Sequence, residues 1–251
     1  MRSRTRKVSI KGFLETSFVD WDGHISSVIF LGGCNFRCPF CHNRDLVLHP
    51  DKIEDLPLGS VIRTLRKYRI WVDRVVVTGG EPTINPGLSE LLRLLKKEGL
   101  KVKLDTNGSF PERVKLLVKE GLVDFISMDV KGPIEGYEKW CGVSVNKDSI
   151  LKTINFLQES CIDYEFRMTV VPLLHSEEDV YETARLLRGS KAFKIQAFRP
   201  INTLDPSYSS APPLPDENLQ RIRKKVAEIL KQPGIKFTPE NSRDVFALMD
   251  A

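Results

Sequence analysis

Three cysteines lie close together in this 251-residue chain, in the segment GGCNFRCPFCHN. Cys34, Cys38 and Cys41 have the spacing CxxxCxxC. An iron–sulfur cube has four iron corners, and most protein-bound cubes take four cysteine ligands. Three thiolates leave one iron free for another ligand, much as a catalytic zinc keeps one open position. The motif therefore predicts a loop that wraps around a cluster with one reactive corner.

Two other interpretations compete for this motif. Structural zinc normally takes four ligands in two closely spaced pairs, and the nearby fourth candidate, His42, adjoins Cys41 and would struggle to face inward with it. A zinc-loop protein whose basic N-terminus, MRSRTRK, contacts nucleic acid is the alternative from a different class. Simple burial of three small thiols is disfavoured because the stretch contains Gly, Asn, Arg and Pro without an apolar period.

The motif, with Phe40 at its aromatic position, resembles that of the radical S-adenosylmethionine (SAM) enzymes. The longer stretch DWDGHISSVIFLGGCNFRCPFCHN resembles the activating enzymes of glycyl-radical enzymes, in particular those of anaerobic ribonucleoside-triphosphate reductase and of pyruvate formate-lyase. This resemblance implies a 4Fe-4S cluster whose open iron is chelated by SAM, and cleavage of SAM to a 5'-deoxyadenosyl radical. It further implies a glycyl-radical enzyme as protein substrate and a reduced flavodoxin or ferredoxin-like electron donor. A small molecule or a modified nucleoside is the alternative substrate.

The elements that must position these residues follow an α/β pattern, because short β-branched runs alternate with helix-period segments. Strands are predicted at Val28–Leu31, Arg74–Thr78, Lys101–Thr106, Val123–Asp129, Tyr164–Val171 and Lys194–Phe198. Helices are predicted at Ser60–Tyr68, Gly87–Lys97, Pro111–Lys119, Lys147–Glu159, Glu177–Arg188 and Asp216–Lys231. Six units are too few for a complete eight-unit barrel, so we predict a partial (β/α)6 TIM-like barrel, which the resemblance also implies.

The chain is predicted to form a single domain over residues 1–251, with a core at about 20–200. Residues 201–251 would add a loop, a helix and a tail. Segment Ile201–Pro215 has four prolines and is predicted to be an irregular loop that could flank a substrate opening.

Polar residues follow successive predicted strands. Thr78–Pro82, Asp105–Gly108 and Met128–Lys131 come after runs of apolar residues, as the cysteine loop does. The carboxyl ends of parallel barrel strands share one rim, so these residues should meet there. The resemblance implies that backbone oxygens of Gly79 and Gly80 and the side chain of Glu81 accept from the SAM ammonium group, with Phe40 beside the adenine. Alternatively, Glu81 orients its turn and Phe40 packs over the cluster.

Two carboxylates on this rim would repel the carboxylate of SAM unless a cation intervenes. The resemblance implies a monovalent-cation site made from Asp105, Thr106, Asp129 and the carbonyl of Met128, with oxygen ligands of the kind that hard cations prefer. Lys131 would then neutralise charge near the SAM carboxylate or ribose. The alternative for Asp129 and Lys131 is an ordinary salt bridge of small energy.

Arg167 alternates with apolar neighbours on its predicted strand, so it should enter the barrel interior, where it needs an anion. The resemblance implies that this anion belongs to SAM. Gln196 and Arg199 depart from the pattern of pyruvate formate-lyase activating enzymes, which leaves their roles open.

The other cysteines and histidines carry no metal spacing. Cys141 and Cys161 are predicted to be packing residues, and His24, His49 and His175 to lie at the surface or in turns.

Composition sets the broad class of protein. A net charge of +5 with mixed signs argues only weakly for an acidic partner or for nucleic acid, so nucleic acid is not the expected partner. No run approaches the ~20 apolar residues of a membrane span. The cysteines form no disulfide framework, and cluster thiolates need a reducing compartment, so the expectation is a soluble cytoplasmic protein.

Replacing Cys34, Cys38 or Cys41 by Ala should abolish cluster binding and SAM cleavage together, since each thiolate would hold one iron. Iron and sulfide content and the yield of 5'-deoxyadenosine after anaerobic reconstitution measure the two effects. A variant that keeps full cleavage would contradict the cluster assignment.

Overall fold

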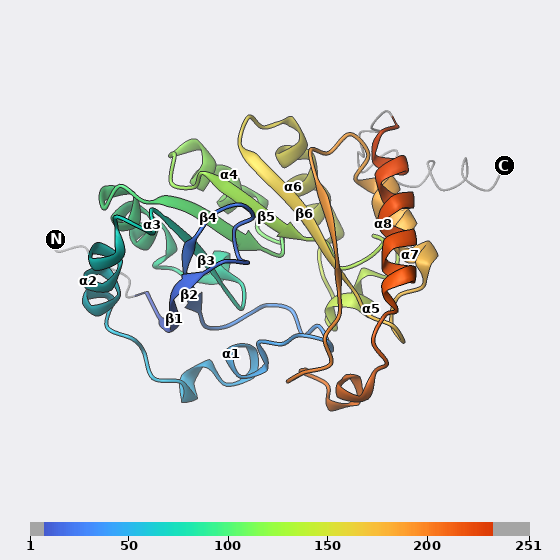
Figure 1. Ribbon diagram of the computed structural model, residues 1–251, viewed down its shortest axis with the longest axis horizontal. Coiled ribbons are helices and arrows are strands. Elements are labelled where there is room, and N and C mark those ends of the chain that lie inside the picture. Colours follow the sequence, from blue (N-terminus) through green and yellow to red (C-terminus); the bar gives the residue numbers. More distant parts are fainter. Residues whose placement is uncertain (1–7, 233–251) are drawn as a thin grey trace.

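The computed structural model describes residues 8–232, so the basic MRSRTRK segment lies outside the described residues. Seven strands form one open sheet in chain order, and its two outermost strands are β1 and β7 (Figure 1). Strands β2 to β7 run parallel, whereas β1 is antiparallel to β2. The strands are β1 Ile10–Ser17, β2 Ser26–Leu31, β3 Arg74–Gly79, β4 Lys101–Thr106, β5 Phe125–Asp129, β6 Asp163–Val170 and β7 Phe193–Ala197.

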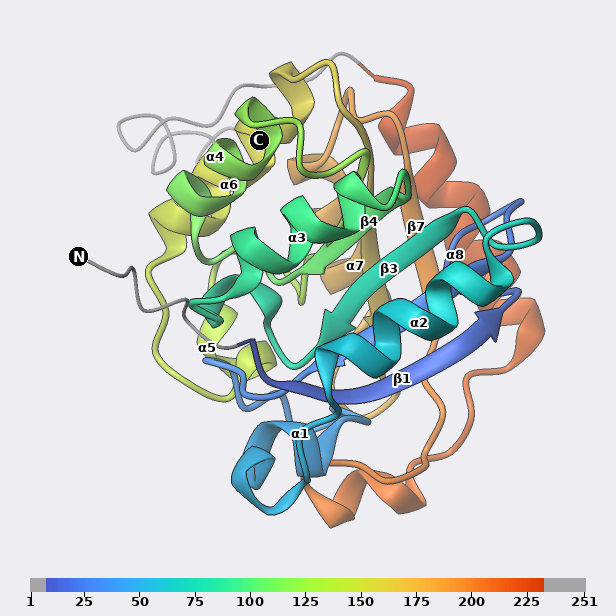
Figure 2. The same ribbon diagram turned by 90° about the vertical axis from the view of Figure 1, so that its left-hand side faces the viewer.

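Helices connect successive parallel strands and cover the outer face of the sheet. Figure 2 shows α2 and α3 on the outer side of the first strands, and in Figure 1 α7 and α8 lie together beside the last ones. The described α-helices are α1 Arg44–Leu48, α2 Leu58–Tyr68, α3 Leu88–Lys97, α4 Pro111–Lys119, α5 Tyr137–Cys141, α6 Lys147–Glu159, α7 Glu177–Leu186 and α8 Asp216–Leu230. Short 3-10 helices lie at η1 Pro50–Lys52, η2 Pro82–Ile84 and η3 Pro206–Ser210.

The apolar core lies between the sheet and these helices. In α3, Leu88, Leu91, Leu92 and Leu95 are buried at the i, i+3, i+4 and i+7 positions that face a sheet. A second apolar cluster joins β6 and β7 to α7 and α8 and includes Met168. The predicted helical and parallel-strand units are thus confirmed as an α/β fold with a sheet that does not close.

The inner face of the curved sheet is apolar on one half and polar on the other. Trp21, Val28 and Val76 make a small apolar cluster on the side of β2 and β3. On β4, β5 and β6 the inward positions carry charged and polar side chains, because alternate residues of a strand point to opposite faces. These inward residues are Lys103, Asp105, Ser127, Asp129, Glu165, Arg167 and Thr169.

The sequence did not predict β1, α1 or α5. Strand β1 is an antiparallel edge strand whose register shifts twice, and Gly12 interrupts its alternation, so its period-2 signal is weak. Helices α1 and α5 have five residues each, too few for a helical period to appear.

Segment Ile201–Pro215 contains regular structure, contrary to the prediction of an irregular loop. The side chain of Asp205 accepts from the N–H of Ser207 and Pro206 starts the 3-10 helix η3, where its fixed φ favours the first turn. The N–H of Asp205 also donates to the carbonyl of Pro39, 2.8 Å away, so this segment lies against the cysteine loop.

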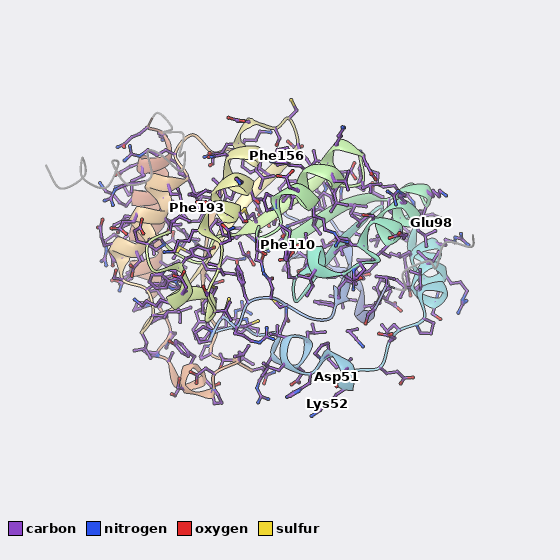
Figure 3. The ribbon with its side chains drawn as sticks, turned by 180° about the vertical axis from the view of Figure 1, so that it is seen from behind. Asp51, Lys52, Glu98, Phe110, Phe156 and Phe193 are labelled. Atoms are coloured by element: carbon purple, nitrogen blue, oxygen red, sulfur yellow. The ribbon has the colours of Figure 1, made fainter. Side chains whose placement is uncertain are left out.

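The segment after β1 crosses the amino-terminal end of the barrel interior. Lys103 donates to the carbonyl of Asp20 at 2.7 Å, and Asp22 pairs with Lys194 of β7 at 2.8 Å. The cysteine loop and α1 cover the opposite end. In Figure 3, which shows the molecule from behind, Asp51 and Lys52 of η1 lie at the lower edge and Phe156 of α6 lies near the upper edge.

No helix among residues 8–232 is long and apolar enough to cross a bilayer.

Lys103 and Glu165 form a buried ion pair inside the barrel, 3.2 Å apart, and the hydroxyl of Ser127 donates to the same carboxylate. Replacing Lys103 by Met should destabilise the protein by about 3–5 kcal/mol, because Glu165 would keep a buried charge without a cation. Urea unfolding measures the change.

The control is Arg185→Ala, which breaks an exposed ion pair with Glu178 and should cost less than about 1 kcal/mol. An equal loss in the two variants would contradict the interior role of Lys103.

Candidate functional site

A cavity of about 250 Å³ lies at the carboxyl edge of the parallel strands. It brings together residues from the cysteine loop and from the ends of β3, β4, β5, β6 and β7. The predicted site residues that line it are Cys34, Cys38, Phe40, Cys41, Gly79, Gly80, Glu81, Asp105, Thr106, Asp129, Lys131 and Arg167. Met128 does not line the cavity; its side chain is buried in the core and lies beside Gly108. The cysteine loop after β2 and five further strand ends therefore converge on one site; the sequence predicted this for the loop and for three of those strands, β3, β4 and β5.

The cysteine loop is held in shape by its own backbone. The N–H of Phe36 donates to Sγ of Cys34 at 3.4 Å, and the N–H of Cys41 donates to the carbonyl of Cys38 at 3.0 Å. The guanidinium of Arg37 donates to the carbonyls of Cys34 and Phe36 at 2.7 Å each. These contacts fix the shape of the loop while the three cysteines remain free thiols.

Burial keeps the thiols protonated in the protein alone. It raises the pKa of Cys34 to about 11 and that of Cys38 to about 12, and it raises the pKa of Cys41 as well. Thiolates are the species that bind iron, so loading a cluster here releases protons.

The glycine turn after β3 touches the cysteine loop backbone to backbone. Gly79 has φ +123°, and a Cβ on it would lie 2.2 Å from the carbonyl oxygen of Leu31. A Cβ on Gly80 would lie 1.9 Å from the carbonyl oxygen of Gly33. The N–H of Glu81 donates to that same carbonyl at 2.8 Å, so glycines are required for the two segments to meet.

Glu81 is buried, and its carboxylate already serves protein donors. Oε1 accepts from the N–H and hydroxyl of Thr83 and from the hydroxyl of Thr106, and Oε2 accepts from the N–H of Asn107 at 2.6 Å. Burial raises the pKa of Glu81, and these donors oppose the rise. The carboxylate thus orients the turn, which is the alternative role given for Glu81 above. Three of the hydrogen bonds are to Oε1 and one is to Oε2.

Asn43 is the last residue of the DWDGHISSVIFLGGCNFRCPFCHN segment, and the sequence predicted no role for it. Its side-chain amide donates to the carbonyl of Gly79 at 2.6 Å, which fixes the direction of that carbonyl at the cavity. A second amide, Asn107, donates to Asn35 of the cysteine loop at 2.9 Å. Neither contact could be read from sequence spacing, because the partners lie 36 and 72 residues apart.

Arg167 enters the barrel interior, as its alternation predicted, and the two rim aspartates supply its anions. Nε of Arg167 donates to Asp129 at 2.9 Å, and its terminal nitrogen lies 3.2 Å from Oδ2 of Asp105. Lys131 pairs with the other oxygen of Asp129 at 3.1 Å. The two carboxylates are therefore balanced by two cationic side chains. A bound cation was predicted because the aspartates would repel the carboxylate of SAM, and Arg167 and Lys131 already reduce that repulsion.

The electrostatics of this cluster follow from its burial and its pairing. Burial would raise the pKa of Asp129, but the charges of Arg167 and Lys131 outweigh it and hold the pKa at about 2. Burial raises the pKa of Asp105, and Arg167 opposes that rise. Oδ1 of Asp105 is buried and has no hydrogen-bond partner among residues 8–232.

His175 is buried beside the site, so the predicted surface position is wrong, whereas the predicted turn position holds: its N–H donates to the carbonyl of Val171 at 2.9 Å and closes the turn after β6. Nδ1 accepts from the N–H of Val171 at 3.0 Å, so Nε2 carries the proton and donates to the carbonyl of Lys131 at 2.9 Å. The ring stacks on Trp140 at 4.6 Å and meets Phe40 edge-on at 6.0 Å. His175 thus joins the end of β6 to the segment that carries Lys131.

The two cysteines outside the motif differ in their burial. Cys141 is fully buried in the core, as predicted, whereas Cys161 is exposed, so its prediction as a packing residue is wrong. Cys161 lies at the end of α6, where the chain turns toward β6 at the surface.

A family model for the radical SAM superfamily matches residues 28–187, more than half of the chain. The chain belongs to the radical SAM superfamily. A protein of Methanocaldococcus jannaschii, provisionally named a glycyl-radical enzyme activating enzyme, is 31% identical over 227 residues, which cover 88% of this chain and 92% of that protein. The pyruvate formate-lyase-activating enzyme of Clostridium pasteurianum is 25% identical over 193 residues, 74% and 79% of the two chains.

Solved structures share the fold of this radical SAM enzyme. QueE from Escherichia coli matches with a TM-score of 0.52 at 18% identity, covering 88% of this chain and 90% of its own. The predicted family and the partial-barrel class are therefore confirmed, with β1 added to the six predicted strands.

The residues present fit the cluster and cofactor that the superfamily uses. Three thiols share the cavity with a turn that only glycine can form, and one buried carboxylate oxygen there has no partner within the described chain. Within residues 8–232, no three His, Cys, Asp or Glu side chains are placed to hold a single metal ion. Membership of the radical SAM superfamily disfavours the zinc-loop interpretation.

His175 should make stability depend on pH. Burial lowers its pKa from the usual 6.5 to about 4, so the folded state binds fewer protons than the unfolded state between these values. Its contribution is fully present above about pH 6.5 and is lost as pH falls toward 4, by up to about 3 kcal/mol.

Urea unfolding of the cluster-free protein between pH 4 and 7.5 measures this effect. The carboxylates titrate in both proteins, so the comparison of wild type with His175→Gln isolates the histidine. His24→Gln, at an exposed histidine, should retain the full pH slope. Equal slopes in wild type and His175→Gln would show that His175 is not buried and neutral.

Proposed function

We propose that this radical SAM enzyme activates a glycyl-radical enzyme, most specifically the anaerobic ribonucleoside-triphosphate reductase, by removing a Cα hydrogen from one glycine of that partner. The observation that carries the proposal is the convergence of the three cysteines and the strand-end residues on one cavity. Similarity to activating enzymes over most of the chain supports the reaction class. The choice of reductase rests on the resemblance of the DWDGHISSVIFLGGCNFRCPFCHN segment.

Each wall of the cavity has a proposed part. Cys34, Cys38 and Cys41 hold three irons of a 4Fe-4S cluster. The bound cluster and SAM supply the 5'-deoxyadenosyl radical when an electron arrives, which is chemistry that belongs to the cofactors. The chain's residues bind, orient and exclude water, and none needs to act as a general base.

The glycine turn is proposed to bind the SAM ammonium group. The carbonyls of Gly79 and Gly80 accept from it, and Oε2 of Glu81, which already accepts from the N–H of Asn107, accepts as well. Asn43 supports this site by holding the Gly79 carbonyl in place. Phe40, which is 6% exposed and packed beside His175, covers the cluster and lies against the adenine.

Charge is proposed to orient the other end of SAM. Arg167 and Lys131 attract its carboxylate and ribose, while Asp105 and Asp129 keep both cations in place. A monovalent cation at Asp105, Thr106, Asp129 and the Met128 carbonyl stays a prediction, and the unpartnered Oδ1 of Asp105 is the oxygen that favours it.

Other parts of the proposal concern the cell. We infer a single catalytic unit over the whole chain, a reducing compartment such as the cytoplasm, and a reduced flavodoxin or ferredoxin-like donor, because cluster thiolates persist only under reducing conditions.

Replacing Asp129 by Ala should leave the cluster intact and weaken SAM binding at least about tenfold. The substitution removes the acceptor that positions both Arg167 and Lys131, and hydrogen bonds to charged groups contribute about 1.5–3 kcal/mol each. Titration of the reconstituted, reduced protein with SAM, followed by electron paramagnetic resonance (EPR), measures the affinity.

Asp163→Ala is the matched control, because Asp163 is an exposed aspartate at the start of β6. It should bind SAM like wild type. Unchanged affinity in Asp129→Ala would exclude the proposed role of the ion cluster.

The reaction itself is tested with the reconstituted protein, SAM, a chemical reductant and a purified anaerobic ribonucleoside-triphosphate reductase. We expect a glycyl-radical EPR signal on the reductase and one 5'-deoxyadenosine per radical. The Cys38→Ala variant should give neither. A radical on pyruvate formate-lyase but not on the reductase would change the partner, and SAM cleavage with no radical on either would overturn the proposed function.

A further inference from the structure

Two polar side chains of the cavity have no protein partner. Thr169 of β6 and Gln196 of β7 line the cavity, are half-buried, and make no side-chain hydrogen bond or ion pair within residues 8–232. They face each other directly across the β6–β7 ladder. The charged side chains that precede them on the two strands do form ion pairs: Arg167 pairs with two aspartates and Lys194 pairs with Asp22.

The position of this pair, which we call the Thr169–Gln196 pair, is the edge of the site. Strand β7 is the last strand of a sheet that does not close, so the cavity wall ends there. The predicted SAM contacts lie on β3, β4, β5 and β6 and in the cysteine loop. The Thr169–Gln196 pair lies outside this set of contacts, on the last two strands of the sheet.

The chemistry of the pair indicates a neutral, amide-like ligand. A carboxamide offers one acceptor and two donors, and a hydroxyl offers both functions, which matches the C=O and N–H of a peptide backbone. A phosphorylated small molecule would instead require free cations. The lysine and the arginine that line the cavity, Lys131 and Arg167, pair with carboxylates of the chain and are proposed to orient SAM.

We propose that the Thr169–Gln196 pair binds the peptide backbone on either side of the target glycine and so helps to select a polypeptide substrate. This inference rests on the proposed function. A glycine has no side chain by which it can be held, so recognition of its position must use the backbone and the neighbouring residues. The pair contacts substrate and is not proposed to hold the cluster.

The test uses the reconstituted full-length protein and two synthetic peptides, one spanning the glycyl-radical site of an anaerobic ribonucleoside-triphosphate reductase and one spanning that of pyruvate formate-lyase. The variants are Gln196→Ala, Gln196→Glu and Thr169→Val, the last two of which nearly preserve side-chain volume. Gln220→Ala is the matched control, at an exposed glutamine of α8. Iron content establishes that each variant carries its cluster.

Three quantities are measured for each protein: the Kd for SAM by EPR titration, the rate of SAM cleavage without peptide, and the KM for the peptide that wild type uses. We expect KM to rise about tenfold in the Gln196 variants and about threefold or more in Thr169→Val. The Kd for SAM and the cleavage rate without peptide should stay within about twofold of wild type, and Gln220→Ala should change nothing.

Two results overturn the inference while leaving the proposed function intact. A rise in the Kd for SAM that matches the rise in KM would assign the pair to the cofactor, and an unchanged KM in all variants would show that the pair binds no peptide. If wild type cleaves SAM but forms no radical on either peptide or on the two full-length partners, the proposed function fails, and the inference fails with it.

Discussion

A charge buried in a protein must be paired, and this requirement organises the mouth of the barrel. Asp105, Asp129, Lys131 and Arg167 come from three strand ends and are linked by three ion pairs of 2.9, 3.1 and 3.2 Å. Losing any member would leave a partner charged in a poorly hydrated place, which costs several kcal/mol. The strands must therefore keep their register at this edge, and the positions of the cavity walls follow from it.

A second constraint ties the cysteine loop to that mouth. The loop meets the glycine turn backbone to backbone, so the two move as one piece, and Asn43 and Asn107 add hydrogen bonds between them. His175 fixes the remaining wall by joining the end of β6 to Lys131. On the side proposed for the cluster and SAM, hydrogen bonds and ion pairs join the walls of the site, whereas the side chains of Thr169 and Gln196 have no partner within residues 8–232. That asymmetry suits an enzyme that holds its cofactors in a fixed place and leaves polar groups free to contact a substrate.

Local patterns were enough for most of the fold. Parallel strands buried on the helix side and helices with apolar residues at i, i+3 and i+4 leave strong periodic signals, as in α3. Strand β1 left a weak signal because edge strands depend on pairing more than on composition, and η3 was hidden by prolines that favour a first turn as readily as a loop. For Arg167, the alternation of residues along the strand predicted that the side chain faces inward. It did not predict that the side chain pairs with two aspartates.

The sequence by itself determined the kinds of chemistry: three thiols at cluster spacing, glycines where backbones must touch, and charged residues at strand ends. These follow from residue type and short spacing, which are local properties. Only the tertiary structure decided the partners: that Glu81 is engaged by its own turn, that His175 is buried and neutral, and that the side chain of Gln196 has no partner within residues 8–232. The physical reason is that hydrogen bonds and ion pairs depend on distance in space, and the curved sheet brings together residues up to 72 positions apart in the chain at this site.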